Sequence, residues 1–204
     1  MEEVKDLGVI VSQNLKPSKQ CAAAAKRASR ILGMIYRNIK IRAPRIMSRL
    51  IKQLIRPHVE YAVQAWSPWL RRDIELLESV QRRATKMVTW LRDLPYEERL
   101  RRLNLTTLEK RRVRGDNIET FKILRGLEEL TEEDFFDRPE ASQATRGHSL
   151  KLRKKHTRLD IRKYFYTCRA VDSFNSIPPS AAQVQTVMEF KKGLQRGERA
   201  IARL

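Results

Sequence analysis

The chain has 204 residues, of which 43 are Lys or Arg and 24 are Asp or Glu, so its formal net charge is +19. Its hydrophobic content of 41% allows a packed core in one domain or two small ones, and no apolar run is long enough to predict a transmembrane helix. Cys21 and Cys168 are the only cysteines, which excludes a disulfide framework and a cysteine zinc site and favours reduced packing residues in an intracellular protein.

The N-terminal residues predict a single short strand. In residues 4–12, Leu7, Val9 and Val11 alternate with their neighbours, and the segment is rich in β-branched side chains. A lone strand needs a sheet to join, so we interpret residues 1–15 as the last piece of a larger domain.

Two basic lines follow in residues 7–59, a stretch with twelve Lys or Arg and no Asp or Glu. At about 100° per residue each line lies opposite an apolar side, which predicts two amphipathic helices, one capped by Ser18 and one begun by Pro44. Solubility alone would explain either line, but two lines without an interleaved acid predict a polyanion, with nucleic acid favoured over a membrane surface. The lines consist of Lys19, Lys26, Arg30, Arg37, Arg45, Arg49, Lys52 and Arg56.

The second helix meets a proline, and Pro57 is predicted either to end it or to kink it. The buried segment that follows contains several aromatic residues. We interpret Tyr61, Trp66 and Trp69 as core residues, with stacking against nucleobases as the alternative.

The longest helix is predicted over residues 71–91, because its apolar residues recur at intervals of three and four. Its outer side carries Glu78 and Arg82 at the i,i+4 spacing that favours an ion pair. Arg82, Arg83 and Lys86 form a smaller basic patch there, which is a further candidate for phosphate contacts.

Two more helices complete a predicted helical domain of residues 16–126. Pro95 begins the first, and a capping box of Thr106 and Glu109 opens the second, which ends at Gly126.

An acidic hinge over residues 127–145 separates this domain from a small basic C-terminal domain, residues 146–204. In the latter, a hairpin is predicted from His148 onward, followed by a helix near residues 164–175 and a last helix opened by a Thr186–Glu189 capping box. The expected fold is therefore mainly α, with a short N-terminal strand and a small α+β C-terminal region. The basic residues near the hairpin turn are Lys151, Arg153, Lys154 and Lys155.

No residue pattern predicts catalysis. His58, His148 and His156 are scattered, without a carboxylate or cysteine at useful spacing. The glycines form no phosphate loop, and the clustered carboxylates that two-metal phosphoryl transfer requires are missing from the most basic half. We therefore expect no catalytic residue, no metal site and no cofactor in this chain.

Six segments, taken in order, resemble the C-terminal part of reverse transcriptases from LINE-type, jockey-like non-LTR retrotransposons. The resemblance covers nearly the whole chain, and its most distinctive segments are RPHVEYAVQAWSP and LLESVQRRATKMV. The six segments are KDLGVIVSQNL, CAAAAKRASRILGMI, LIRPHVEYAVQAWSP, DIELLESVQRRATKMV, LPYEERLRRLNLTTLEKRRVRGD and TRGHSLKL.

The resemblance implies that KDLGVIVS is similar to the end of the palm, residues 16–95 to the helical thumb, and the rest to the region that follows. The family's aromatic-Ala-Asp-Asp motif and upstream metal-binding Asp have no counterpart here, and neither has its endonuclease domain. The resemblance thus implies a truncated RNA-directed DNA polymerase that lacks its catalytic palm and is not an enzyme on its own. A thumb grips its template–primer duplex through the backbone.

The leading hypothesis is therefore a nuclear protein that binds RNA or an RNA–DNA duplex through phosphates, without a membrane partner. One alternative is a helical scaffold whose basic sides meet an acidic protein. Another is a thumb supplied to a separate polymerase palm, and a decayed open reading frame without a selected role is also open.

Overall fold

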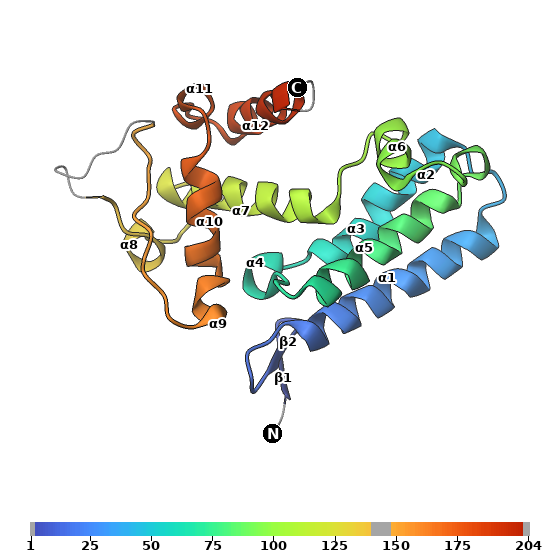
Figure 1. Ribbon diagram of the computed structural model, residues 1–204, viewed down its shortest axis with the longest axis horizontal. Coiled ribbons are helices and arrows are strands. Elements are labelled where there is room, and N and C mark those ends of the chain that lie inside the picture. Colours follow the sequence, from blue (N-terminus) through green and yellow to red (C-terminus); the bar gives the residue numbers. More distant parts are fainter. Residues whose placement is uncertain (1–2, 140–147, 202–204) are drawn as a thin grey trace. The chain divides into compact units, whose positions relative to one another are not determined.

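The computed structural model describes residues 3–139 and 148–201, with side chains as far as residue 196 (Figure 1). The chain divides into two compact units, unit 1 (Met1–Arg112) and unit 2 (Val113–Leu204). Helices dominate the described residues, and a two-stranded antiparallel sheet lies at the N-terminus, which confirms the mainly α prediction. None of the described helices combines the length and the apolar character that a membrane span requires.

The division between the units lies inside helix α7 (Leu108–Leu124), whereas the sequence analysis placed the domain boundary in residues 127–145. The reason is hydrophobic packing: Leu108 belongs to the core of unit 1, and Phe121 belongs to the core of unit 2. The described part of the predicted hinge contains helix α8 (Glu132–Phe135), and residues 140–145 lie outside the described residues.

The N-terminal segment is a hairpin and not the predicted single strand. Strands β1 (Glu3–Asp6) and β2 (Val9–Ser12) pair antiparallel. Leu7 and Gly8 between them both have positive φ, 42° and 84°, the combination that reverses the chain in a two-residue hairpin turn. Gly8 adopts this conformation without strain. The alternation of apolar residues continues across the turn, and for this reason the sequence predicted one strand instead of two.

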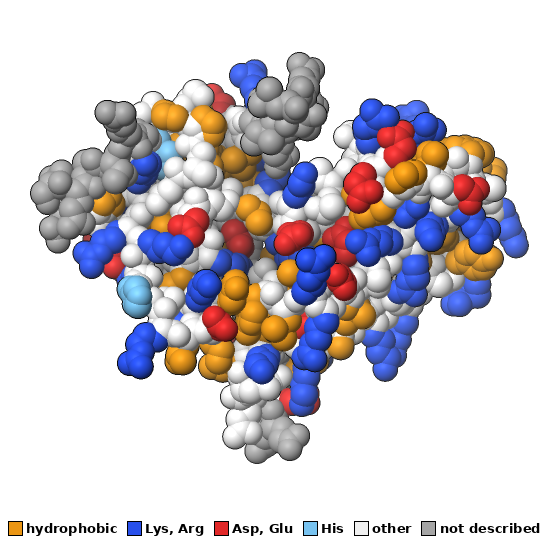
Figure 2. Space-filling model, in the orientation of Figure 1, with side chains coloured by type: hydrophobic (Ala, Val, Ile, Leu, Met, Phe, Trp, Pro, Cys, Tyr) orange, Lys and Arg blue, Asp and Glu red, His pale blue; other side chains and the backbone are white. Residues whose placement is uncertain are grey.

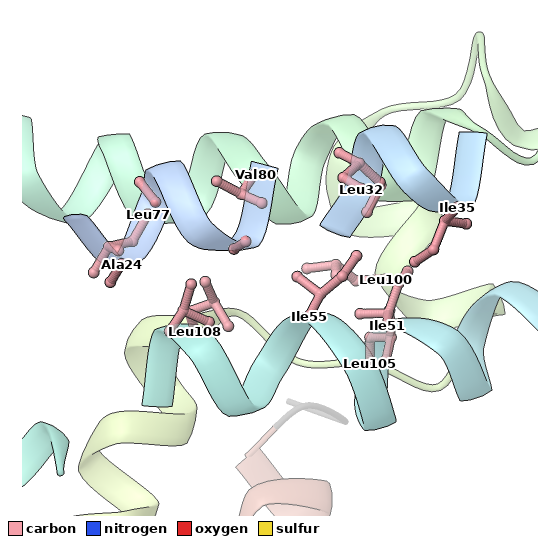
Figure 3. Packing of buried hydrophobic residues seen from close by; sticks show 14 of the residues in the cluster. Ala24, Leu32, Ile35, Ile51, Ile55, Leu77, Val80, Leu100, Leu105 and Leu108 are labelled. Atoms are coloured by element: carbon pink, nitrogen blue, oxygen red, sulfur yellow. The ribbon is translucent and has the colours of Figure 1, made fainter. Parts of the chain in front are cut away.

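The core of unit 1 is built mainly from two long helices, α1 (Ser18–Asn38) and α5 (Arg71–Lys86), and from the segment between them (Figure 3). The buried side of α1 is made of small residues: Ala24 and Ala28 are fully buried, so α5 can approach closely. Ser18 is the first residue of α1 and not its predicted cap, and its hydroxyl donates to Asp73 Oδ2 at 2.6 Å. The helical elements after β2 are α1 (Ser18–Asn38), α2 (Pro44–Leu50), η1 (Ile51–Ile55), α3 (Arg56–Glu60), α4 (Val63–Trp66), α5 (Arg71–Lys86), η2 (Thr89–Leu91) and α6 (Tyr96–Arg102).

A π-helical turn, η1, joins α2 to α3, and it changes which side of the following helix faces the core. The N–H of Arg56 donates to the carbonyl of Ile51, five residues back, which widens the helix just before Pro57. Pro57 has no N–H and would crowd the carbonyl four residues earlier in a regular helix, so the wide turn lets the chain continue to Glu60. Because a π turn contains an extra residue, the buried side moves from position 54 to positions 55 and 56.

Helix α7 begins with a cap that comes from another helix. The N–H of Leu108 donates to Oε2 of the buried Glu78 at 2.9 Å, which places a carboxylate at the positive end of the helix dipole. The hydroxyl of Thr107 accepts the N–H of Lys110 at 3.2 Å, so Thr107 caps the helix where Thr106 was predicted.

The predicted surface pair of Glu78 and Arg82 does not form. Glu78 accepts hydrogen bonds from the hydroxyl of Tyr96 and from Nε2 of Gln81, and Arg82 instead lies over the Tyr96 ring, 5.1 Å from its centroid. Burial raises the pKa of the Tyr96 phenol, which keeps it protonated as a donor to the carboxylate.

Unit 2 is built around a cluster of buried phenylalanines, of which Phe121, Phe174 and Phe190 are fully buried. Phe121 and Phe190 stack with ring centroids 4.2 Å apart, and Phe174 lies 6.3 Å from Phe190. Gly126 has φ +61° and ends α7, as predicted, with the N–H of Leu127 bonded to the carbonyl of Lys122 at 2.9 Å. The remaining helices are α9 (Asp160–Lys163), α10 (Tyr166–Asn175), α11 (Pro179–Ala182) and α12 (Val187–Ile201), the last with the predicted Thr186–Glu189 capping box.

The hairpin predicted from His148 onward is absent from the described residues. Leu150 and Leu152 are buried as their alternation suggested, but no second strand pairs with them. The side-chain amide of Asn175 satisfies the backbone of Leu152 instead, accepting its N–H at 2.9 Å and donating to its carbonyl at 2.8 Å. Arg153 forms one isolated bridge, to Asp137. Residues 146 and 147 of the predicted C-terminal domain lie outside the described residues.

Candidate nucleic-acid interface

The first basic line lies on the exposed side of α1. Lys26, Arg30 and Arg37 are exposed, and none of the described residues forms a hydrogen bond or ion pair with their side chains. Lys19 is also exposed, but it forms an ion pair with Glu3 of the hairpin. Blue side chains lie along the edge of the molecule where α1 runs (Figure 2).

The second basic line borders an open groove of about 590 Å³ between α2–η1 and α6. Arg45, Arg49 and Lys52 line it, all three are exposed, and no described residue pairs with their side chains. At about 1.5 Å per residue these cations extend over roughly 10 Å along the helix axis. The groove is therefore a row of cations, and none of its described lining residues is a carboxylate.

The wall of the groove opposite the second basic line contains two residues that the sequence did not identify as candidates for nucleic-acid binding. Arg102 and Asn104 line the same groove, and Arg102 donates through Nε to Glu98 Oε1 at 2.7 Å. The clustering of basic residues in the last turn of α6 was the available signal for Arg102. The hydroxyl of Ser48 donates to the carbonyl of Leu103 at 2.7 Å and so holds the two walls of the groove together.

Arg56 is the exception among the predicted contacts, because its side chain is buried. It is 6% exposed, its Nε donates to Gln81 Oε1 and its NH2 group to the carbonyl of Thr106, each at 3.4 Å. Desolvation, together with the charge of Arg111, lowers the pKa of Arg56 to about 10. The prediction that Arg56 continues the outward line is wrong, and the cause is the extra residue of the π turn.

The patch on α5 is divided by the structure. Lys86 is exposed, Arg82 covers the Tyr96 ring, and Arg83 reaches across to α1, where its NH2 group donates to Ser29 Oγ at 2.8 Å. Arg83 and Arg37 thereby line a second, smaller groove, between α1 and α5.

The basic residues of the C-terminal segment lie among carboxylates of unit 2. Lys154 forms an ion pair with Asp172, and Lys155 lies 3.1 Å from Asp137. Lys151 is half-buried, and the side chain of Arg153 is exposed. Carboxylates of the same unit thus partly neutralise the positive charge of this segment. The role of these residues in binding stays a prediction.

Among the aromatic candidates, only Trp66 is fully in the core, where its Nε1 donates to the carbonyl of Tyr61 at 2.8 Å. Trp69 is half-buried, and Tyr61 is exposed with its hydroxyl bonded to the carbonyl of Leu7 at 2.9 Å. Trp90 is 65% exposed on η2, and the sequence analysis did not select it. Exposed Trp90 and Tyr61 are therefore better placed than Trp66 to contact a base.

Among the described residues, no group of three or more His, Cys, Asp or Glu is arranged to hold a metal ion. His148 is buried, with Nε2 3.1 Å from the carbonyl of Phe174, and desolvation lowers its pKa. Both cysteines are buried, and burial raises the pKa of the Cys21 thiol to about 12.

Neither a protein-family model, nor a curated protein, nor a solved structure matches this chain.

Proposed function

We propose that unit 1 binds nucleic acid through its phosphate backbone, as the thumb-like and following region of a non-LTR retrotransposon reverse transcriptase. The observation that carries the proposal is the groove bordered by Arg45, Arg49 and Lys52, whose cations have no carboxylate partner among the described residues. Unpaired cations in a row gain most from a partner that repeats its negative charge, and phosphates along a nucleic-acid strand do so.

The chemistry of the groove favours contact with the backbone over reading of bases. Arg and Lys bind phosphate oxygens through charge-assisted hydrogen bonds whatever the sequence. The exposed cations Lys26, Arg30 and Arg37 on α1 extend the positive surface of the same unit. An RNA–DNA hybrid is the duplex that the family resemblance suggests as the ligand.

The first test is the salt dependence of the affinity of the full chain for an RNA–DNA hybrid. Each phosphate contact contributes roughly 0.7 to 0.9 to the slope of log affinity against log salt concentration, because a bound counterion is released. Binding through several phosphates should therefore weaken steeply with salt and vary little with sequence. A flat salt response would contradict the proposal.

A charge-removal variant then assigns the contact to the groove. Arg45→Gln, Arg49→Gln and Lys52→Gln together should weaken binding at low salt by on the order of tenfold and reduce the slope by roughly 2. The matched control removes the same charge from other exposed positions of unit 1, by Arg71→Gln, Arg92→Gln and Lys110→Gln.

The comparison of the two triple variants separates position from net charge. If both lose the same affinity, the protein attracts nucleic acid only through its overall charge. If neither variant nor the wild type binds the hybrid, but an acidic protein is bound, the basic surface belongs to a scaffold protein instead.

A further inference from the structure

The smaller groove, between α1 and α5, differs from the first in having an apolar floor. Its volume is about 320 Å³, at the lower end of the range of about 300–1,000 Å³ for small-ligand sites. Leu32, Gly33 and Met87 contribute to its lining, together with Tyr36. Such a lining suits a flat, weakly polar group better than a phosphate.

Two arginines from different helices also line this groove. Arg37 comes from α1, and Arg83 comes from α5 and is held in place by its hydrogen bond to Ser29 Oγ, 2.8 Å long. Among the residues that the structure describes, no carboxylate lines this groove. The charge therefore favours a ligand that joins an apolar ring to anionic groups on both sides.

Tyr36 is presented at the groove in a fixed position. It is 58% exposed, and the guanidinium carbon of Arg42 lies 4.3 Å from the centroid of its ring. Arg42 is itself anchored, because its Nε donates to the carbonyl of Ile39 at 3.3 Å and its NH2 group to that of Tyr36 at 3.0 Å. An exposed aromatic ring of this kind can stack on a base.

The packing of the core of unit 1 does not explain why residue 33 is a glycine. It lies inside α1, where glycine weakens a helix relative to alanine. A Cβ at this position would meet only the Arg37 guanidinium, at an ordinary contact distance of 3.6 Å, so neither the fold nor a close backbone approach requires glycine. Gly33 lines the groove, and the absence of a side chain leaves space there beside the Arg37 guanidinium.

We propose that the α1–α5 groove accepts one unpaired nucleobase of a single-stranded nucleic acid, with Arg37 and Arg83 binding the phosphates on either side. This inference rests on the proposed nucleic-acid binding and adds a preference for an unpaired strand. Lys26, Arg30 and Arg37 lie along roughly 16 Å of α1 and would contact the same strand's backbone as it approaches.

The test fills the groove without changing the charge. Gly33→Leu should weaken binding of a single-stranded RNA of about twelve nucleotides by roughly fivefold or more, and leave the affinity for an RNA–DNA hybrid of equal length unchanged. Gly33→Ala is the matched control: it should keep both affinities and raise the melting temperature by a few degrees. Circular dichroism establishes that both variants are folded.

An abasic strand with the same number of phosphates separates base from backbone. The wild type should prefer the natural strand over the abasic one, and Gly33→Leu should bind both equally, so that the two changes are not additive. Tyr36→Phe should preserve this preference and Tyr36→Leu should reduce it, because only the former keeps the ring.

Each other outcome has a distinct meaning. If the wild type binds hybrid and single strand but prefers no base over an abasic site, the groove proposal fails while the proposed function stands. If it binds neither nucleic acid, the proposed function fails. If single-strand binding survives Gly33→Leu, and an acidic peptide with a central Phe competes only at the wild-type groove, the site belongs to a protein partner and the proposal is overturned.

Discussion

The two units carry similar kinds of residues but use their charges differently. Unit 1 has 25 basic and 11 acidic residues, a net charge of +14, and unit 2 has 18 and 13, a net charge of +5. In unit 2 seven of the 13 acids lie in residues 127–140, and acids elsewhere in the unit also pair with its cations, as in the pairs Arg169–Asp116 and Lys154–Asp172. In unit 1 most acids follow residue 59, where they pair with cations such as Arg71 and Arg101.

The difference shows how a basic run should be interpreted. KLRKK in unit 2 is the denser run in the sequence, yet two of its lysines pair with carboxylates. The cations of α1 and α2–η1 are more widely spaced, and most of them pair with no described residue. Whether a basic side chain can bind a partner depends on where the acidic side chains lie in three dimensions. The number of basic residues in a short stretch of sequence does not show this.

The largest effect should come from breaking a charge pair of unit 2. Asp116 accepts two hydrogen bonds from Arg169, from Nε at 2.8 Å and from NH2 at 3.0 Å, and Asp116 is 5% exposed. Asp116→Asn removes a carboxylate that is almost completely buried from a guanidinium whose side chain is only 16% exposed, which should lower the free energy of unfolding by about 3–5 kcal/mol. Hydrogen exchange at the amides of α10 measures the loss.

The control for this prediction is Arg71→Gln, which removes an exposed ion pair with Glu75 and should change stability little. If Asp116→Asn were equally mild, the pair would be a surface interaction and the contrast between the units would be weaker than the structure indicates.

A single substitution can place a carboxylate beside the cations of the larger groove of unit 1, as carboxylates lie beside the cations of unit 2. Gln53 lines that groove and is exposed. Gln53→Glu is nearly isosteric and supplies a carboxylate beside Arg49 and Lys52, so it should weaken hybrid binding by roughly three- to tenfold while the melting temperature stays nearly constant.

The matched control is Gln13→Glu, which adds the same charge at an exposed position of the N-terminal segment. Binding titrations of both variants at one salt concentration are sufficient. Equal losses would mean that the groove has no special part in binding.

The smallest effect concerns pH. Desolvation lowers the pKa of buried His148 below its ordinary value of 6.5, and the positive charges of Lys151 and Arg138 act in the same direction, while its hydrogen bond to Phe174 opposes them. The unfolded chain therefore binds the proton first, so stability should fall as pH drops below about 6.5.

This loss should be confined to unit 2 and should shrink in His148→Gln. Hydrogen exchange at pH 7.5 and pH 5.5 would follow both units in one experiment. An acid response of equal size in the variant would show that carboxylates, and not His148, cause it.

Several features were predictable because they depend on nearby residues alone. The apolar spacing of α1 and α5, the start of α2 at Pro44 and the Thr186–Glu189 cap all follow from side chains within one or two helical turns. The acid-free stretch of residues 7–59 was equally plain, and its exposed cations on α1 and α2 are where the helical period placed them.

Other features required the folded chain. Leu152 and Asn175 lie 23 positions apart in the sequence. No periodicity predicts that the side-chain amide of Asn175 will form the hydrogen bonds that a neighbouring strand would otherwise form with Leu152. Gly33 and Met87 reveal nothing individually, and the groove they share exists only because α1 packs on α5.

The sequence by itself determined where the long helices lie and which stretch lacks acids, since both depend on short-range spacing and composition. Only the tertiary structure decided which cations remain available. One extra residue in the π turn rotated Arg56 into the core, and the folded chain brought Glu3 to Lys19 and Asp172 to Lys154. The physical reason is that burial and ion pairing depend on distances through space, which the order of residues along the chain does not specify.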